Sequence, residues 1–197
     1  MFQTRIHGRG GQGVVTAAEL LASAAFDAGR HAQAFPSFGS ERTGAPVVAY
    51  CRIDDHPIRT REPIAEPNAI IVQDATLLWS GEPLAGVPAD AYLLINSTKS
   101  AAELAAEDPA LAERGGSRIV TVGATEIALR RIGRPVPNAV LLGGFAALTG
   151  IVPLSGVQEA LRNRFPGVVG VSNAEAAAEA FEVVLAEPEM RVHAPAD

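Results

Sequence analysis

The sequence holds few of the residues that build redox or metal sites. Cys51 is the only cysteine among 197 residues, so the chain can form no internal disulfide and cannot hold an iron–sulfur cluster by itself. The four histidines are scattered without the spacing of a zinc site, which argues against a dedicated metal centre. Cys51 itself lies in the apolar run 47–53 and is predicted to be a buried strand thiol rather than a nucleophile.

Long apolar runs and an excess of positive charge are also missing. No uninterrupted apolar stretch reaches the ~18 residues of a membrane-spanning helix, and Arg5 and Arg9 interrupt the N-terminus where a signal peptide needs an apolar segment. The net charge of -6 disfavours nucleic acid as a partner. We therefore expect a cytoplasmic protein with neither a membrane nor a nucleic-acid partner.

Glycine, by contrast, is concentrated near the N-terminus. An apolar run at 2–6 is predicted to be a strand, the amphipathic run 14–28 is predicted to be a helix, and the segment between them holds four glycines. Such a turn lets the backbone approach a ligand closely. The unpaired N–H groups and the positive dipole end of the following helix suit a phosphate or pyrophosphate.

The glycine spacing also fits the dinucleotide-binding fingerprint G-x-G-x-x-G, laid over Gly8, Gly10 and Gly13. That fingerprint needs an acidic residue about 20 residues further on, at the end of the second strand. The predicted second strand, 31–35, is followed by Pro-Ser-Phe instead. The missing acid argues against an NAD-dependent dehydrogenase. An alternative is that the glycines only let the helix pack against the sheet.

The remainder of the chain alternates between strand and helix patterns. Strands are predicted at 47–53, 69–72, 91–96 and 118–122, and helices at 76–80, 101–106, 125–131, 140–149, 154–165 and 174–186. The pattern predicts an α/β fold, a three-layer sandwich with a mostly parallel, Rossmann-like sheet and a helical C-terminal part.

Several local predictions accompany this fold. Residues 58–60 are expected to return as a hairpin partner of the strand 47–53. Trp79 is expected to pack in the core, and the alternative is that it marks an interface. Asn138 is expected to be the N-cap of the uncharged helix 140–149, which should be buried either in the core or between subunits, and Asn173 the cap of the last helix.

A second unusual loop, 36–46, reads P-S-F-G-S-E-R-T-G-A-P. It leaves the carboxyl end of the second predicted strand and should lie beside the glycine loop, in the crevice where doubly wound folds bind ligands. Arg42 could meet a phosphate there with two parallel hydrogen bonds. The alternative is an arginine in solvent, paired with Glu41.

Three stretches together, 6–18, 36–47 and 138–148, resemble the gamma subunits of 2-oxoacid:ferredoxin (acceptor) oxidoreductases, in the pyruvate/ketoisovalerate branch. The resemblance implies a gamma-type domain at residues 1–187 and a loose C-terminal tail at 188–197. One departure concerns the family motif E-R-R-G-A-P-V, in which Thr43 replaces the second arginine and removes one cation.

The family oxidatively decarboxylates a 2-oxoacid to acyl-CoA and CO2. The resemblance implies that thiamine diphosphate, Mg and [4Fe–4S] clusters sit on partner subunits of alpha, beta and ferredoxin-like delta type, with ferredoxin or another electron acceptor taking the electrons. The chain alone would be inactive, with no catalytic residue and no metal ligand. Pyruvate, branched-chain and aryl 2-oxoacids all stay open, because their pocket would lie on the thiamine subunits.

For this chain the resemblance implies a docking place for CoA as co-substrate. The glycine loop would cradle the pyrophosphate, Arg9 and Arg42 would neutralise phosphate charge, and polar side chains would add hydrogen bonds. The implied binding residues are Gly8, Arg9, Gly10, Gly11, Gln12, Gly13, Val14, Ser40, Arg42, Thr43 and Asn138. The alternatives are a purely structural assembly subunit of the same complex and a free-standing nucleotide-binding protein.

Overall fold

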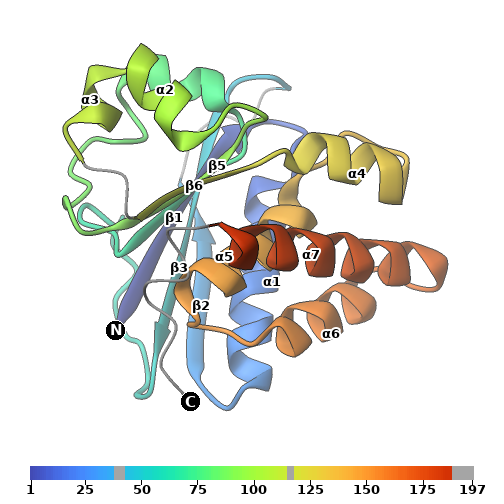
Figure 1. Ribbon diagram of the computed structural model, residues 1–197. Coiled ribbons are helices and arrows are strands. Elements are labelled where there is room, and N and C mark those ends of the chain that lie inside the picture. Colours follow the sequence, from blue (N-terminus) through green and yellow to red (C-terminus); the bar gives the residue numbers. More distant parts are fainter. Residues whose placement is uncertain (38–42, 115–117, 188–197) are drawn as a thin grey trace.

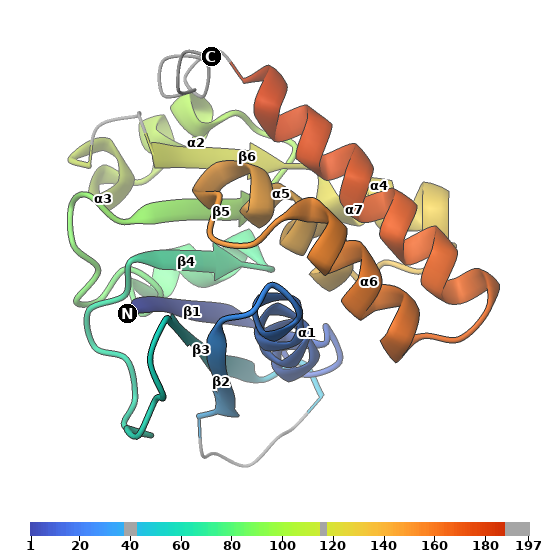
Figure 2. The ribbon, with the colours of Figure 1, turned by 90° about the horizontal axis from the view of Figure 1, so that it is seen from below.

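A six-stranded sheet forms the centre of the computed structural model, which describes residues 1–37, 43–114 and 118–187. The strand order is β2-β3-β1-β4-β5-β6, visible edge to edge in Figure 2. The strands are β1 (Phe2–Arg9), β2 (His31–Pro36), β3 (Pro46–Asp54), β4 (Ala69–Val72), β5 (Tyr92–Asn96) and β6 (Ile119–Val122). Of these strands only β3 runs against the others, because it pairs antiparallel with both β1 and β2. The predicted mostly parallel sheet is confirmed.

Helices cover both faces of the sheet (Figure 1). One face carries α1 (Val14–Asp27), α4 (Ala124–Ile132), α5 (Asn138–Thr149), α6 (Leu154–Arg164) and α7 (Val168–Ala186). The other carries η1 (Ala75–Ser80), α2 (Ala101–Glu107) and α3 (Pro109–Ala112). In β4, Ile71 packs into the first layer while Ile70 and Val72 pack into the second, as the two-residue period of a strand buried on both faces requires. The three-layer sandwich with a helical C-terminal part is confirmed.

The uncharged helix α5 is buried, as predicted. Its closest neighbour is α7, and Gly143 allows the approach. A Cβ built on Gly143 would stand 1.8 Å from the carbonyl oxygen of Ala177, where no side chain fits. The two helix backbones therefore pack directly on one another.

The predictions for residues 58–60 and for Trp79 were wrong. Residues 58–60 form no strand, because β2 and β1 already occupy the two edges of β3 and leave no edge for a hairpin partner. Trp79 is not in the core, since its side chain is 81% exposed on η1. The predicted strand 2–6 is longer than expected and continues to Arg9, because Gly8 still pairs with Val47 of β3.

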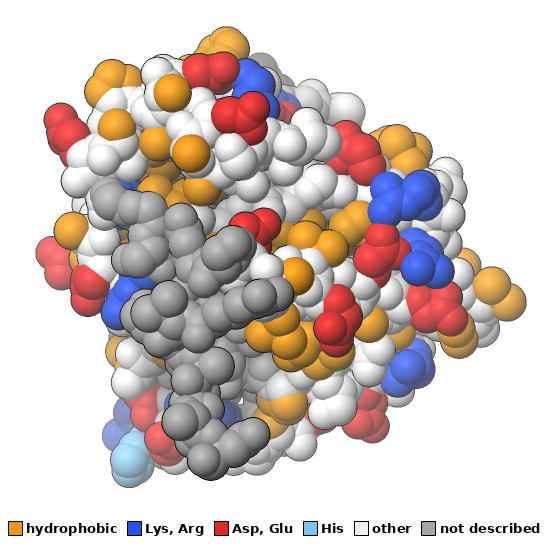
Figure 3. Space-filling view, in the orientation of Figure 1, with side chains coloured by type: hydrophobic (Ala, Val, Ile, Leu, Met, Phe, Trp, Pro, Cys, Tyr) orange, Lys and Arg blue, Asp and Glu red, His pale blue; other side chains and the backbone are white. Residues whose placement is uncertain are grey.

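Two predicted helix caps were also wrong. Asn138 is the first residue of α5 and not its N-cap, which is Pro137. Asn173 lies inside α7, which begins five residues earlier at Val168, and its amide donates 2.8 Å to the Val169 carbonyl. The early start leaves Val168, Val169 and Val171 exposed at the tip of the α6–α7 hairpin, where Figure 3 shows hydrophobic side chains at the surface.

In the described part of the chain, no helix is long and apolar enough to cross a membrane. The predicted tail, 188–197, lies outside the described residues, and the domain limits 1–187 stay a prediction.

Candidate functional site

The glycine loop joins β1 to α1 and ends in an uncapped helix N-terminus. Gly11 and Gly13 have φ values of 96° and 71°, a region that favours glycine. The first helical hydrogen bond runs from the Ala17 N–H to the Gly13 carbonyl, at 2.9 Å. Within the described residues no group accepts from the N–H groups of residues 14–16, and no side chain caps α1. Three donors at the positive end of the helix dipole thus stay available to an anion.

The glycines of this loop serve two different purposes. A Cβ on Gly8 would stand 2.6 Å from Cγ2 of Val14, and one on Gly13 would stand 2.5 Å from Nδ2 of Asn138. These two glycines therefore let helices pack closely. A Cβ on Gly11 would meet nothing within 4 Å. Packing does not explain Gly11, whose backbone faces open space.

The second unusual loop returns beside the glycine loop, as predicted. The Gly10 N–H donates 2.9 Å to the Ala45 carbonyl, the Gly44 N–H donates 3.1 Å to the Gly10 carbonyl, and Thr43 forms a parallel bridge with Gly10. The structure thus brings Thr43 to the loop. Ser40 and Arg42 lie outside the described residues.

A cleft of about 470 Å³ opens over this N-terminus. Its lining comes from the glycine loop, the first turns of α1 and the start of β3: Arg9, Gly10, Gly11, Gly13, Val14, Val15, Thr16, Glu19 and Val47. The predicted site left out Val15, Thr16, Glu19 and Val47, although Glu19 follows Val15 by four positions and Thr16 by three, spacings that place side chains beside one another on a helix. Gln12 is absent from this lining. Its side-chain oxygen accepts 2.8 Å from the Arg9 N–H and closes the turn.

Asn138, the most distant predicted site residue, does reach the loop. Its Nδ2 donates to the Gly13 carbonyl over a long 3.4 Å, and its Oδ1 accepts 2.8 Å from the Ala139 N–H. The side chain is buried. The Asn138 side chain thus holds the end of the glycine loop through the backbone carbonyl of Gly13.

Arg9 is held by a network that the sequence did not predict. Its guanidinium donates to Asp74 Oδ2 at 2.8 Å, to Thr76 Oγ1 at 2.9 Å and to the Gly44 carbonyl at 3.1 Å. Burial raises the pKa of Asp74, but hydrogen bonds from Thr76 and Arg9 outweigh it and leave that pKa below its ordinary value. The charge of Arg9 is therefore balanced by Asp74, and the residue clamps the loop in place.

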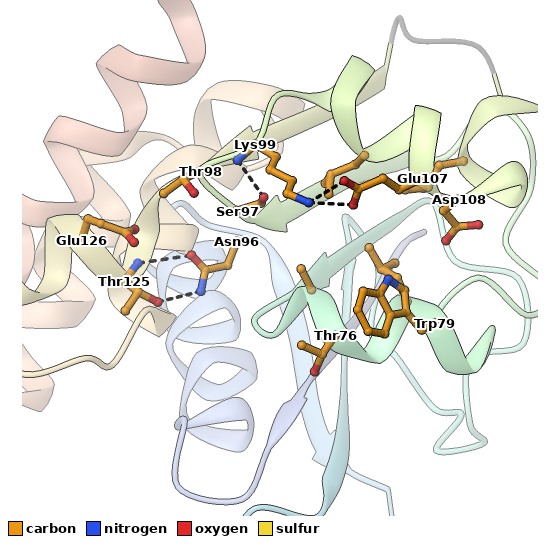
Figure 4. A pocket seen from close by; sticks show the side chains of 14 residues that line it. Thr76, Trp79, Asn96, Ser97, Thr98, Lys99, Glu107, Asp108, Thr125 and Glu126 are labelled. Carbon is orange, nitrogen blue, oxygen red and sulfur yellow. Dashed lines mark hydrogen bonds and ion pairs between the residues drawn. The ribbon is translucent and has the colours of Figure 1, made fainter.

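A second cleft, of about 360 Å³, lies further along the same edge of the sheet (Figure 4). It is framed by η1, α2 and the start of α4, which follow the carboxyl ends of β4, β5 and β6. Three leucines, Leu78, Leu104 and Leu111, give it an apolar lining, and the exposed indole of Trp79 stands beside them. Polar residues complete the lining: Thr76, Asn96, Ser97, Thr98, Lys99, Glu107, Asp108, Thr125 and Glu126.

Asn96 fixes the base of this second cleft. Its Nδ2 donates to the Gln73 carbonyl at 2.9 Å and to Thr125 Oγ1 at 2.8 Å, while its Oδ1 accepts 3.2 Å from the Thr125 N–H. These bonds join the ends of β4 and β5 to the first turn of α4. Lys99 donates to both carboxylate oxygens of Glu107, at 2.6 and 2.7 Å.

Two titratable side chains, His7 and Cys51, are buried in β1 and β3. Burial, helped by the positive charge of Arg5, lowers the pKa of His7 to about 4. Burial raises the pKa of Cys51 to about 12, and the predicted buried thiol is confirmed. In the described ranges, no three His, Cys, Asp or Glu side chains come together in a way that could hold a metal ion.

Known proteins resemble this chain in sequence and in fold. Residues 3–183 match the family described as pyruvate ferredoxin/flavodoxin oxidoreductase. The common gamma subunit of the pyruvate/ketoisovalerate oxidoreductases of Thermococcus kodakarensis is 47% identical over 181 residues, which are 92% of this chain and 96% of that protein.

Solved structures agree with this match. The pyruvate oxidoreductase subunit PORC of Thermotoga maritima has a TM-score of 0.77 at 35% identity, covering 92% of this chain and 95% of its own. The 2-oxoglutarate:ferredoxin oxidoreductase of Magnetococcus marinus, solved with 2-oxoglutarate, coenzyme A and succinyl-CoA bound, has a TM-score of 0.71 at 16% identity, covering 95% of this chain and 32% of its own. The latter likeness shows the fold alone.

Proposed function

The chain belongs to the pyruvate ferredoxin/flavodoxin oxidoreductase family as a gamma-type subunit, and on that premise we propose that its glycine loop docks coenzyme A for the complex. The resemblance seen in three stretches of the sequence is thereby confirmed. The reaction of the complex would be oxidative decarboxylation of a 2-oxoacid to acyl-CoA and CO2. Thiamine diphosphate, on a partner subunit, supplies the carbanion chemistry of that reaction.

The partner assignments are those that the family resemblance implies. One cysteine cannot hold a [4Fe–4S] cluster, and the described residues offer no metal-binding cluster. We assign thiamine diphosphate, Mg and the iron–sulfur clusters to alpha, beta and delta subunits, with ferredoxin or another acceptor taking the electrons. The gamma subunit then contributes binding energy rather than a reacting group.

The observation that carries the CoA proposal is the uncapped start of α1 facing the 470 Å³ cleft. A pyrophosphate needs several donors in one place, and the free N–H groups of residues 14–16 supply them. Gly11 lets the phosphate oxygens approach the backbone, because its missing side chain leaves open space. The Magnetococcus protein, of which this fold covers 32%, was solved with coenzyme A bound, which makes CoA the ligand to test at this loop.

Other predicted site residues have supporting roles in this proposal. Asn138 and Gln12 hold the glycine loop in shape, and Arg9 fixes it to the end of β4. Thr43 lies beside Gly10. Arg42 belongs to the same loop as Thr43, and we propose it as the cation that meets a phosphate of CoA.

The test compares two glycine variants in the assembled oxidoreductase. Gly11→Ala and Gly29→Ala both place a methyl group on a backbone with positive φ and open surroundings, so both incur a similar strain of about 1 kcal/mol. Only Gly11 lies in the cleft. We expect Gly11→Ala to raise the KM for CoA about tenfold or more with the KM for the 2-oxoacid unchanged, and Gly29→Ala to leave both unchanged. Equal effects of the two variants on CoA would contradict the proposal.

Arg42→Ala distinguishes docking from pure assembly. If Arg42 binds a phosphate, the variant complex assembles normally and its KM for CoA rises. If the complex instead falls apart while the assembled remainder keeps its CoA affinity, the chain is a structural subunit and the docking role of Arg42 is wrong.

A further inference from the structure

Trp79 occupies an unusual place for a large apolar side chain. It is the only tryptophan of the chain, and 81% of its side chain is exposed. It lines the second cleft together with the three leucines from η1, α2 and α3 (Figure 4). An exposed indole beside an apolar lining provides a stacking surface for a flat ring.

We propose that this second cleft binds the purine ring of CoA, stacked on Trp79. The proposal rests on the CoA-docking function of the glycine loop. It adds to the glycine loop a second binding site, a cleft of about 360 Å³ lined by other residues.

The two clefts are joined by one pair of side chains. Arg9 lines the glycine-loop cleft, Thr76 lines the second cleft, and they share a 2.9 Å hydrogen bond. Both clefts lie at the carboxyl edge of the sheet, over the adjacent strands β1, β4 and β5. A ligand whose pyrophosphate sits at the start of α1 can therefore continue across Arg9 and Thr76 into the second cleft.

The charges of the second cleft suit an adenine ring. Glu107, Asp108 and Glu126 line it, against the single cation Lys99 among the described lining residues. Carboxylates accept hydrogen bonds from the exocyclic amine of adenine. Lys99, now shared with Glu107, is the group that the 3′-phosphate of CoA would meet.

The reacting end of CoA supports the same orientation. Its thiol has to reach an acyl group on a thiamine subunit, so that end must leave this chain. The nucleotide end does not react, and binding it tightly far from the chemistry is how an enzyme holds a co-substrate in place. A closed lining around the pantetheine arm would instead keep the thiol away from its partner.

Trp79 reports on this cleft directly, because no other tryptophan contributes to the fluorescence of the full chain. The probes are CoA, adenosine 3′,5′-bisphosphate and 4′-phosphopantetheine, with CoA binding measured in parallel by calorimetry. We expect CoA and adenosine 3′,5′-bisphosphate to quench Trp79, and 4′-phosphopantetheine to leave it unchanged. Quenching by 4′-phosphopantetheine alone would reverse the orientation and overturn the proposal.

The calorimetric arm separates the two proposals. CoA that binds without changing Trp79 fluorescence would contradict the purine site and leave the glycine-loop function intact. No binding of CoA to the chain or to the complex would contradict the glycine-loop function itself.

Variants of the assembled oxidoreductase provide a second readout. Trp79→Ala should raise the KM for CoA about 5- to 100-fold with kcat unchanged, because stacking on an aromatic side chain contributes about 1–3 kcal/mol, and Trp79→Phe should restore most of the affinity. Phe26→Ala, at another exposed aromatic on α1, is the matched control and should change nothing. Loss of the complex in Trp79→Ala would make Trp79 a subunit contact and overturn the proposal.

Discussion

The Arg9 guanidinium donates a 2.8 Å hydrogen bond to the Asp74 carboxylate, and this ion pair joins the loop after β1 to the end of β4. The two residues are 65 positions apart in the chain. Because Asp74 also accepts from the N–H and the hydroxyl of Thr76, the pair fixes the start of η1 as well. The contacts of Arg9 with Asp74 and Thr76 therefore connect the linings of the two clefts.

The first prediction concerns this ion pair. Arg9→Met should lower the free energy of unfolding by about 1 kcal/mol at neutral pH, a modest value because both side chains are partly exposed. The pKa of Asp74 is below its ordinary value in the folded chain, so the carboxylate stabilises the fold above the unfolded pKa of about 3.9, and this contribution is lost as the pH falls. The difference between Arg9→Met and wild type should accordingly shrink in acid. Urea unfolding at several pH values measures it, and a difference that grows in acid would be inconsistent with the pair.

A second prediction concerns His7. Its pKa of about 4 in the folded chain lies below the ordinary 6.5. Between these two pH values the imidazole is protonated in the unfolded chain but not in the folded one. Stability is then lost as the pH falls from 6.5 towards 4, by on the order of 3 kcal/mol at full effect. His7→Gln should remove most of this pH dependence, whereas the exposed His56→Gln should keep it. Urea midpoints across that pH range decide the matter, and identical slopes in wild type and His7→Gln would refute the assignment.

A third prediction concerns Cys51. The thiol is fully buried in β3 and its pKa is raised to about 12, so neither access nor thiolate is available in the folded chain. A thiol reagent such as DTNB should leave the native chain unlabelled at mildly alkaline pH and label it fully in denaturant. Rapid labelling of the native chain would show that β3 opens, or that Cys51 is not buried.

The three layers, the mostly parallel sheet and the helical C-terminal part could be predicted from the sequence, because each of them is recorded in a local pattern of residues. Continuous apolar runs such as 69–72 are typical of strands buried on both faces, and their alternation with helical patterns predicts the layers. The uncharged segment from Asn138 to Thr149 has no polar face to expose, so its burial could be predicted without knowing its neighbours.

The predictions failed where contacts between distant segments determine the position of a residue. Asn173 carries a cap residue type, but Gly167, with φ 65°, already starts α7 and turns Asn173 into a buried interior residue. Trp79 is apolar, and only the placement of η1 at the rim of a cleft exposes it. The Arg9–Asp74 pair joins segments whose proximity depends on β1 and β4 being neighbours, which no local pattern contains.

The glycine loop was found from its spacing, but the separate purposes of its glycines were not. The crowding of Gly8 by Val14 and of Gly13 by Asn138 becomes visible only when α1 and α5 are placed. The second cleft is lined by leucines from three different elements, which no local pattern of the sequence brings together.

The last prediction concerns the contact of α5 with α7, where two adjacent glycines give a matched pair of variants. Gly143→Ala places a Cβ 1.8 Å from the Ala177 carbonyl oxygen, so the helices must separate, at a cost of about 3 kcal/mol or more. The Cβ of Gly144→Ala meets only side-chain methyl groups, Cγ2 of Val184 at 3.3 Å and Cδ2 of Leu94 at 3.5 Å, and an alanine gains up to about 1 kcal/mol of helix propensity over glycine. We expect Gly143→Ala to be poorly folded or strongly destabilised and Gly144→Ala to unfold close to the wild-type temperature. Calorimetric melting of the two purified chains tests this, and equal melting temperatures would contradict the direct backbone packing of α5 on α7.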